Sequence, residues 1–249
     1  MTPASTTPTP GIRLYNWTTV GRILVFVLAA TSILSLLVDF FYLMSMRAFA
    51  LGVQVPATVV LIAVALVNRA RGDGALCRNV VIGAVAGFVA AVVYDVFRLP
   101  FVFAEDWAID GVVPALPLFK VFPRFGAMIL GQAVEQPAYA SAAHLIGWTY
   151  HFSNGITFGI MYLALIGDAR RRAWWWGVVF AVGLEIALLM TPYANAFGIK
   201  VTPTFIAVTL TAHLVFGAVM GWWARRLTGY GAVGRAEEDD GEYRGVLGA

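Results

Sequence analysis

Apolar residues in this chain occur in long runs, and short segments between the runs carry most of the charge. Runs of about 20 apolar residues match a bilayer core of roughly 30 Å when they form helices. Lipid offers the backbone no hydrogen-bonding partner, so each run is expected to be helical. The pattern predicts an all-α integral membrane protein, a bundle of six transmembrane helices at residues 20–46, 51–68, 76–103, 138–167, 173–192 and 202–226.

A seventh apolar stretch, 115–135, contains Lys120, Pro123 and Arg124. We interpret it as a re-entrant or interfacial helix, and a seven-span protein as the less favoured alternative. Arginine supports this interpretation, because cytoplasmic loops carry an excess of Lys and Arg. Six spans place every arginine cluster on one side of the membrane, together with both termini: Arg13 and Arg22, Arg69 to Arg78, Arg170 to Arg172, and Arg225 with Arg226. A seventh crossing would move the third cluster to the other side.

Composition agrees with a membrane protein. Only 12% of the residues are charged and 60% are hydrophobic, whereas soluble domains carry about 25% charged residues. The net charge of +3 comes from arginine, and it indicates topology rather than nucleic-acid binding. The single Cys77 excludes an internal disulfide and a cysteine-rich metal site. We expect disordered cytoplasmic tails at 1–16 and 229–249 around a transmembrane domain at 17–228, in a bacterial-type inner membrane.

Several polar side chains fall inside the predicted spans, where an ionisable group costs about 2.5–3.5 kcal/mol at the centre and usually faces a bundle interior or cavity. Alternating span directions place most of them in the outer half of the membrane. A random scatter of tolerated polar residues would not favour one leaflet. The group comprises Asp39, Asp95, Arg98, His144, His151, Asn154, Glu185 and His213.

Small residues repeat at four-residue spacing from these polar groups, always on the cytoplasmic side. Gly155 and Gly159 follow His151, and the same spacing recurs after His213, as a weak internal repeat. Small residues allow transmembrane helices to approach closely. The pattern predicts tight packing in the inner half, with polar side chains converging above it. The same faces could also support an oligomer. The rows are Gly83–Gly87–Ala91 before Asp95, Gly177–Ala181 before Glu185, and Gly217–Gly221 after His213.

Two histidines and two carboxylates are the candidate chemical centre. His151 and His213 are predicted ligands of a transition metal, zinc or iron, with Asp95 or Glu185 completing the shell. The remaining carboxylate would act as general base on a metal-bound water. Two alternatives stay open: a metal-free functional role such as a proton relay, and plain hydrogen bonding between helices.

Three further polar residues are predicted to bind substrate. Arg98 lies three positions after Asp95, so it can pair with that carboxylate or bind an anionic headgroup. Asn154 is one helical turn from His151. His144 is about 10 Å from His151 along the helix axis, too far for both to bind one ion easily, so an entrance residue and a ligand are equally open interpretations.

These patterns favour a membrane-embedded, metal-dependent hydrolase or oxidoreductase that acts on a lipid or small amphiphile in the outer half of the bilayer. Membrane lipid is the expected partner, and nucleic acid is not. One alternative is a proton- or ion-coupled transporter that uses the same buried groups. Another is a non-catalytic membrane scaffold or partner-binding subunit.

Overall fold

The computed structural model describes the backbone of residues 16–246 and the side chains of residues 16–229. The predicted N-terminal tail therefore lies outside the described residues apart from Asn16. The final helix continues to Val246, across most of the predicted C-terminal tail, of which 247–249 lie outside the described residues. The disorder and the cytoplasmic location of both tails stay predictions.

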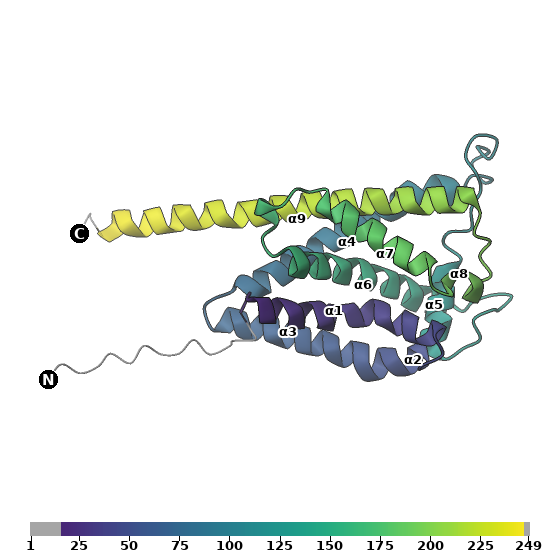
Figure 1. The fold of residues 1–249 in the computed structure, drawn as a ribbon, viewed down its shortest axis with the longest axis horizontal. Coiled ribbons are helices and arrows are strands. Elements are labelled where there is room, and N and C mark those ends of the chain that lie inside the picture. Colours follow the sequence, from purple (N-terminus) through teal and green to yellow (C-terminus); the bar gives the residue numbers. More distant parts are fainter. Residues whose placement is uncertain (1–15, 247–249) are drawn as a thin grey trace.

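All regular elements between residues 16 and 246 are helices, which confirms the all-α prediction. The long helices run side by side along the bundle, while the short helices α2, α5 and α8 gather at one end, opposite the end past which α9 extends (Figure 1). The elements are α1 Thr19–Phe40, α2 Met46–Phe49, the π-helix η1 Ala50–Gln54, α3 Val55–Ala70, α4 Ala75–Val102, α5 Val121–Leu130, α6 Ser141–Ile166, the 3₁₀-helix η2 Ala169–Arg171, α7 Trp176–Leu189, α8 Tyr193–Ala196 and α9 Pro203–Val246.

Four helices are long and apolar enough to cross a membrane: Thr19–Phe40, Met46–Ala70, Ala75–Val102 and Pro203–Gly229. They correspond to four of the six predicted spans and are compatible with a helical membrane protein. The other two predicted spans correspond to α6, which has 26 residues but is not among these four, and to α7, which has only 14. The six-span count therefore stays a prediction.

The predicted segment 115–135 contains one short helix, α5, with ten residues. At 1.5 Å per residue it is about 15 Å long, too short to cross a bilayer. It packs against the first half of α6, where Gly126 lies against the backbone of Ala143 and Gly147 against that of Phe122. Its re-entrant or interfacial placement in the membrane stays a prediction.

Glycines allow backbone contact within two antiparallel helix pairs. In the α4–α6 pair, a Cβ at Gly83 would lie 2.8 Å from the carbonyl oxygen of Gly159, and one at Gly87 would overlap that of Gly155. In the α7–α9 pair, a Cβ on Gly177 would overlap the carbonyl oxygen of Gly217. These contacts confirm that the small-residue rows pack helices together.

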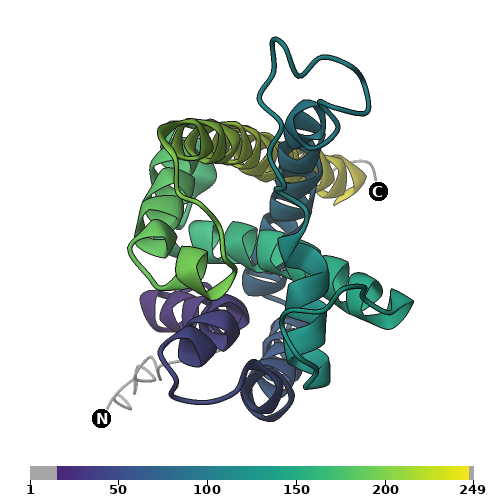
Figure 2. The same ribbon diagram turned by 90° about the vertical axis from the view of Figure 1, so that its right-hand side faces the viewer.

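Seen along the bundle axis, α7 and α9 lie on one side and α4 with α6 on the other, and α1 lies near α7 and α6 (Figure 2). α4 also packs against α9, so the two glycine-linked pairs form one assembly. α1 packs against α6 and α3. The glycine contacts occupy the half of the bundle away from α5 and α8.

Gly87→Ala is expected to destabilise the fold by about 1–3 kcal/mol or more, because the added Cβ would overlap the backbone of Gly155 and helices relax only partly around such overpacking. The measurement is the unfolding midpoint of the detergent-solubilised protein. The matched control is Gly52→Ala, since a Cβ there meets no atom within 4 Å. Equal midpoints for the two variants would contradict the role given to the glycine contact.

Candidate functional site

Asp95, Arg98 and His151 form a connected set between α4 and α6. Arg98 Nη1 donates to Asp95 Oδ1 at 3.2 Å, and His151 Nε2 lies 2.8 Å from Asp95 Oδ2. Asp95 and Arg98 are buried, with 8% and 5% of their surface exposed. Because Arg98 always carries charge, it keeps Asp95 an acceptor, and His151 Nε2 then donates. This assignment follows from the hydrogen-bond network, and it leaves a lone pair on His151 Nδ1 in the neutral ring.

Arg98 is held from several sides. Its Nη2 donates to the carbonyl oxygen of Leu118 at 2.8 Å, in the segment before α5. Its guanidinium carbon lies 4.6 Å from the ring centre of Tyr94 and 5.1 Å from that of Phe119, within the range of cation–π attraction. The remaining Nε is buried and has no hydrogen-bond partner.

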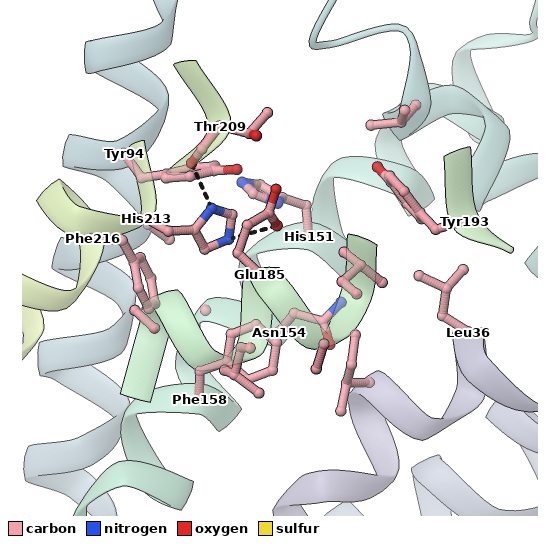
Figure 3. A pocket seen from close by; sticks show the side chains of 18 of the residues that line it. Leu36, Tyr94, His151, Asn154, Phe158, Glu185, Tyr193, Thr209, His213 and Phe216 are labelled. Carbon is pink, nitrogen blue, oxygen red and sulfur yellow. Dashed lines mark hydrogen bonds and ion pairs between the residues drawn. The ribbon is translucent and has the colours of Figure 1, made fainter. Parts of the chain in front are cut away.

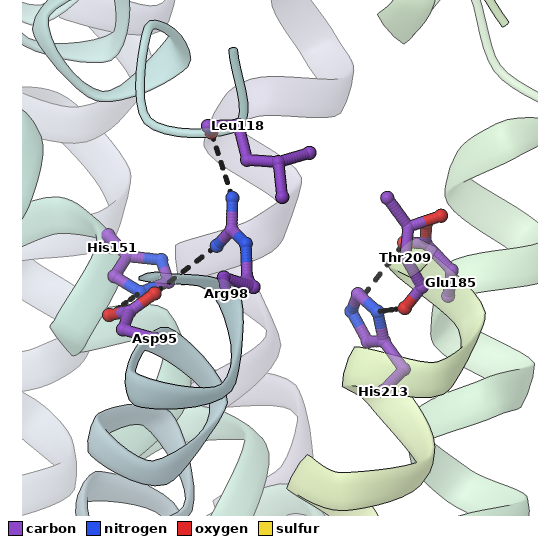
Figure 4. A network of polar contacts seen from close by, with 7 residues as sticks. All are labelled: Asp95, Arg98, Leu118, His151, Glu185, Thr209 and His213. Atoms are coloured by element: carbon purple, nitrogen blue, oxygen red, sulfur yellow. Dashed lines mark hydrogen bonds and ion pairs between the residues drawn. The ribbon is translucent and has the colours of Figure 1, made fainter. Parts of the chain in front are cut away.

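Glu185 and His213 form a second acid–histidine pair, between α7 and α9. His213 Nε2 lies 3.5 Å from Glu185 Oε2, and His213 Nδ1 lies 2.9 Å from the carbonyl oxygen of Thr209. A carbonyl only accepts, so Nδ1 must carry hydrogen. His213 Nε2 therefore faces Glu185 at ion-pair distance, where a proton between the two side chains would lie either on the carboxyl group or on the ring. Figure 4 shows the two sets facing each other across the bundle.

The spacing of each pair from its glycines explains why the side chains meet. Asp95 lies eight residues after Gly87, while His151 lies four before Gly155, so their Cα atoms differ in height by about 6 Å. Side chains on a helix lean toward its N-terminus. In an antiparallel pair, the carboxylate therefore leans toward the glycine contact and the imidazole leans away from it, which closes this gap. Glu185 and His213 have the same spacing from Gly177 and Gly217.

Arg98 and His151 of the first set and both residues of the second line one cavity of about 300 Å³ in the half of the bundle that carries α5 and α8 (Figure 3), whereas Asp95 contacts His151 but is not among the lining residues. Its walls are mainly apolar and come from α1, α4, α5, α6, α7, α8 and α9. Tyr94 lies between the two histidines, with ring centres 5.0 Å from His213 and 6.1 Å from His151. The two histidines therefore line one cavity, and the acids and histidines form two separate pairs.

The four predicted metal ligands do not gather around one point. Within residues 16–229, no group of three or more His, Cys, Asp or Glu side chains is placed to hold a metal ion. A shared zinc would need ligand atoms at about 2.0–2.2 Å from it. The arrangement of these side chains does not support the predicted zinc or iron centre, which stays a prediction.

Of the other polar residues singled out in the sequence, some lie at the cavity and some lie elsewhere. Asn154 lines the cavity, and its Oδ1 accepts from Ser32 Oγ of α1 at 2.7 Å. His144 is exposed on α6, contacts the ring of Tyr139 and does not line this cavity, so it lies apart from the cavity that it was expected to serve. Asp39 accepts from the backbone N–H of Met46 at 2.6 Å and so ties the turn between α1 and α2.

No protein-family model, curated protein or solved structure matches this chain. Its function must therefore be argued from the cavity and the residues that line it.

Three cavity residues were not among the predicted site residues. Tyr94 directly precedes Asp95, and its polar aromatic side chain inside a span was a usable signal. Thr209 lies one helical turn before His213, where an i−4 carbonyl is a natural partner for the ring. Tyr193 reaches the cavity from α8, a short helix between the fifth and sixth predicted spans, where the hydrophobic pattern predicted no element.

Asp95→Asn is expected to lower the free energy of unfolding by about 3–5 kcal/mol, because removing one partner leaves Arg98 buried without compensation. The measurement is unfolding in detergent micelles. Asp168→Asn is the control: it breaks an exposed pair with Arg170, whose side chain is 47% exposed, and should cost less than about 1 kcal/mol. Similar losses of unfolding free energy in both variants would show that the buried pair stabilises the fold no more than the exposed pair does.

Proposed function

We propose that this chain is a membrane-embedded enzyme that performs acid–base chemistry on a lipid or small amphiphile in the cavity between α4–α6 and α7–α9. One observation carries the proposal: His151 and the Glu185–His213 pair line the same cavity, and each histidine is held by a different set of partners. An enzyme needs a base and an acid held in different environments around one substrate.

His151 is the general base. Asp95 accepts from Nε2, fixes the ring orientation and stabilises the imidazolium that forms when Nδ1 takes a proton. Arg98 in turn holds Asp95 in place, since its Nη1 donates to Oδ1 of that carboxyl group. His151 lines the cavity from the α6 side.

The Glu185–His213 pair is the general acid. The carbonyl oxygen of Thr209 accepts from Nδ1 of His213, so Nε2 faces Glu185, and in this proposal the acidic proton lies between these two side chains. Both side chains line the cavity from the opposite pair of helices. Tyr94, whose ring lies between the two histidines, positions the substrate against them.

The proposed setting is a bacterial-type inner membrane with six crossings, cytoplasmic termini and segment 115–135 as a re-entrant or interfacial element. The arginine clusters support this topology. With these six crossings, the cavity falls in the outer half of the bilayer. The substrate would enter from the membrane or from the outer face.

A metal-dependent version of the enzyme remains the rival form of the proposal. His151 and His213 would be the ligands of a zinc or iron ion, and either carboxylate would complete the shell. In that form the two rings must approach each other, although the ring of Tyr94 now lies between them. The acid–base form needs no such rearrangement.

A proton-coupled transporter is the second candidate, and one observation favours it. The α4–α6 and α7–α9 pairs share one construction, with an acid eight residues after a glycine and a histidine four residues before another. Parallel structural repeats with a site at their interface are common in transporters. In liposomes, a transporter would move solute without chemical change, whereas an enzyme would change it.

The enzyme proposal predicts a product that depends on both pairs. Purified protein in nanodiscs of bacterial total lipid extract is expected to generate a new species by mass spectrometry. His151→Gln and Glu185→Gln should each reduce its rate by about 10²–10⁴-fold, the usual contribution of a general acid or base. Asp168→Asn is the control and should retain the wild-type rate.

A chelator separates the two forms of the enzyme: the acid–base form retains its rate, and the metal-dependent form loses it. If the wild type generates no product, or the two variants match it, the enzyme proposal is wrong. A membrane scaffold would give that result.

The six-crossing topology predicts which loops face outward. In a Cys77→Ser background, Gly111→Cys is expected to react with a membrane-impermeant maleimide in intact cells, because the loop before α5 would be outside. Arg171→Cys, in the exposed turn before α7, is expected to react only after the cells are opened. Labelling of both positions in intact cells would contradict six crossings.

A further inference from the structure

We propose that the cavity selects an uncharged amphiphile whose carbonyl or hydroxyl oxygen accepts a hydrogen bond from Nε of Arg98. Where the inference names the substrate class, it rests on the proposed function. The binding of such an amphiphile can be measured even if the protein converts nothing.

Arg98 supplies the observation that points to a ligand. The residue lines the cavity and is 5% exposed. Asp95 and Leu118 occupy its two terminal nitrogens, while Nε is buried without a partner. In Figure 4, Nε lies on the side of the guanidinium nearer the Glu185–His213 pair. A buried donor without an acceptor is destabilising, and more so when it is charged, so an oxygen placed there recovers that cost.

Each acidic side chain near the cavity already has a basic partner. Asp95 lies 3.2 Å from Arg98, and Glu185 faces His213. An anionic headgroup at Nε would meet the carboxylate of Asp95 nearby, and a cationic one would meet the guanidinium itself. Juxtaposed like charges oppose binding. A neutral oxygen satisfies the donor without adding charge, which makes it a better fit than the anionic headgroup first suggested by the sequence.

The rest of the cavity fits a hydrocarbon chain. Leu36 and Leu37 of α1 and Leu184 and Leu188 of α7 line it. Its volume of about 300 Å³ is at the small end for ligand sites, so one slender chain is a better fit than a bulky lipid. Amphiphiles of this kind dissolve in the bilayer that the four apolar helices are built to cross.

The experiment compares three photoreactive probes of equal chain length that carry a diazirine: a long-chain alcohol, the corresponding carboxylate and the corresponding amine. Each is added to the purified full chain in nanodiscs, and the labelled peptides are mapped after irradiation. We expect the alcohol to label cavity-lining residues at least about tenfold more than either charged probe, which corresponds to about 1.4 kcal/mol. Equal labelling by all three, or labelling only outside the cavity, would overturn the inference.

Variants test the contact itself. Arg98→Lys keeps a positive charge beside Asp95 but removes the Nε donor, so alcohol labelling is expected to fall about tenfold. Leu188→Trp fills the cavity and should abolish labelling. Gly183→Trp is the matched control on α7, since a Cβ there meets no atom within 4 Å, and it should label as the wild type does. Undiminished labelling in Arg98→Lys would refute the proposed hydrogen bond.

The outcomes separate this inference from the enzyme proposal. Selective alcohol labelling without any new product in the lipid extract would support the inference and refute the enzyme. A product derived only from a charged lipid would support the enzyme and refute the inference.

Discussion

Close approach of helix backbones is the constraint on which the rest of this structure depends. In α4–α6 and in α7–α9, the helix backbones touch directly at glycines. A contact of that kind sets both the separation of the helices and their relative height. Once these are set, the position of each carboxylate and imidazole follows from helical rise and side-chain lean. The residues that define the candidate site therefore lie in one half of the bundle, and those that position them lie in the other.

The two pairs use the same backbone arrangement and differ in what surrounds them. Arg98, on the same helix as Asp95, makes the first pair a carboxylate that orients a ring. The second pair has no arginine contact, and a backbone carbonyl holds the far nitrogen of its ring instead. In the proposed enzyme, this difference of one guanidinium and one carbonyl gives two similar pairs opposite roles, one as base and one as acid. Low-dielectric surroundings increase the effect of such single contacts.

Much of this arrangement could be predicted from the sequence, because helical periodicity is local. The long helices, the small-residue rows and the gathering of Asp95, His151, Glu185 and His213 near one cavity all follow from spacing along the chain. The pairing does not, since it depends on which helices are neighbours. The ring of Tyr94 between the histidines is a matter of side-chain packing, and the shared metal shell was predicted without it. His144 has the same residue type as the site histidines but lies on an exposed face, and composition alone cannot distinguish the two.

The brevity of α7 has a consequence for the surrounding lipid. Its 14 residues extend about 21 Å, against a hydrocarbon thickness of roughly 30 Å. In the proposed topology, acyl chains beside α7 must shorten or tilt to match it, with Trp174 and Trp175 in the turn before it as interfacial anchors. Hydrophobic mismatch would then depress the headgroup region locally toward Glu185, on the face where Ala187 lines the cavity and is also exposed. A thinned annulus of this kind would shorten the path of an amphiphile from the leaflet to the cavity.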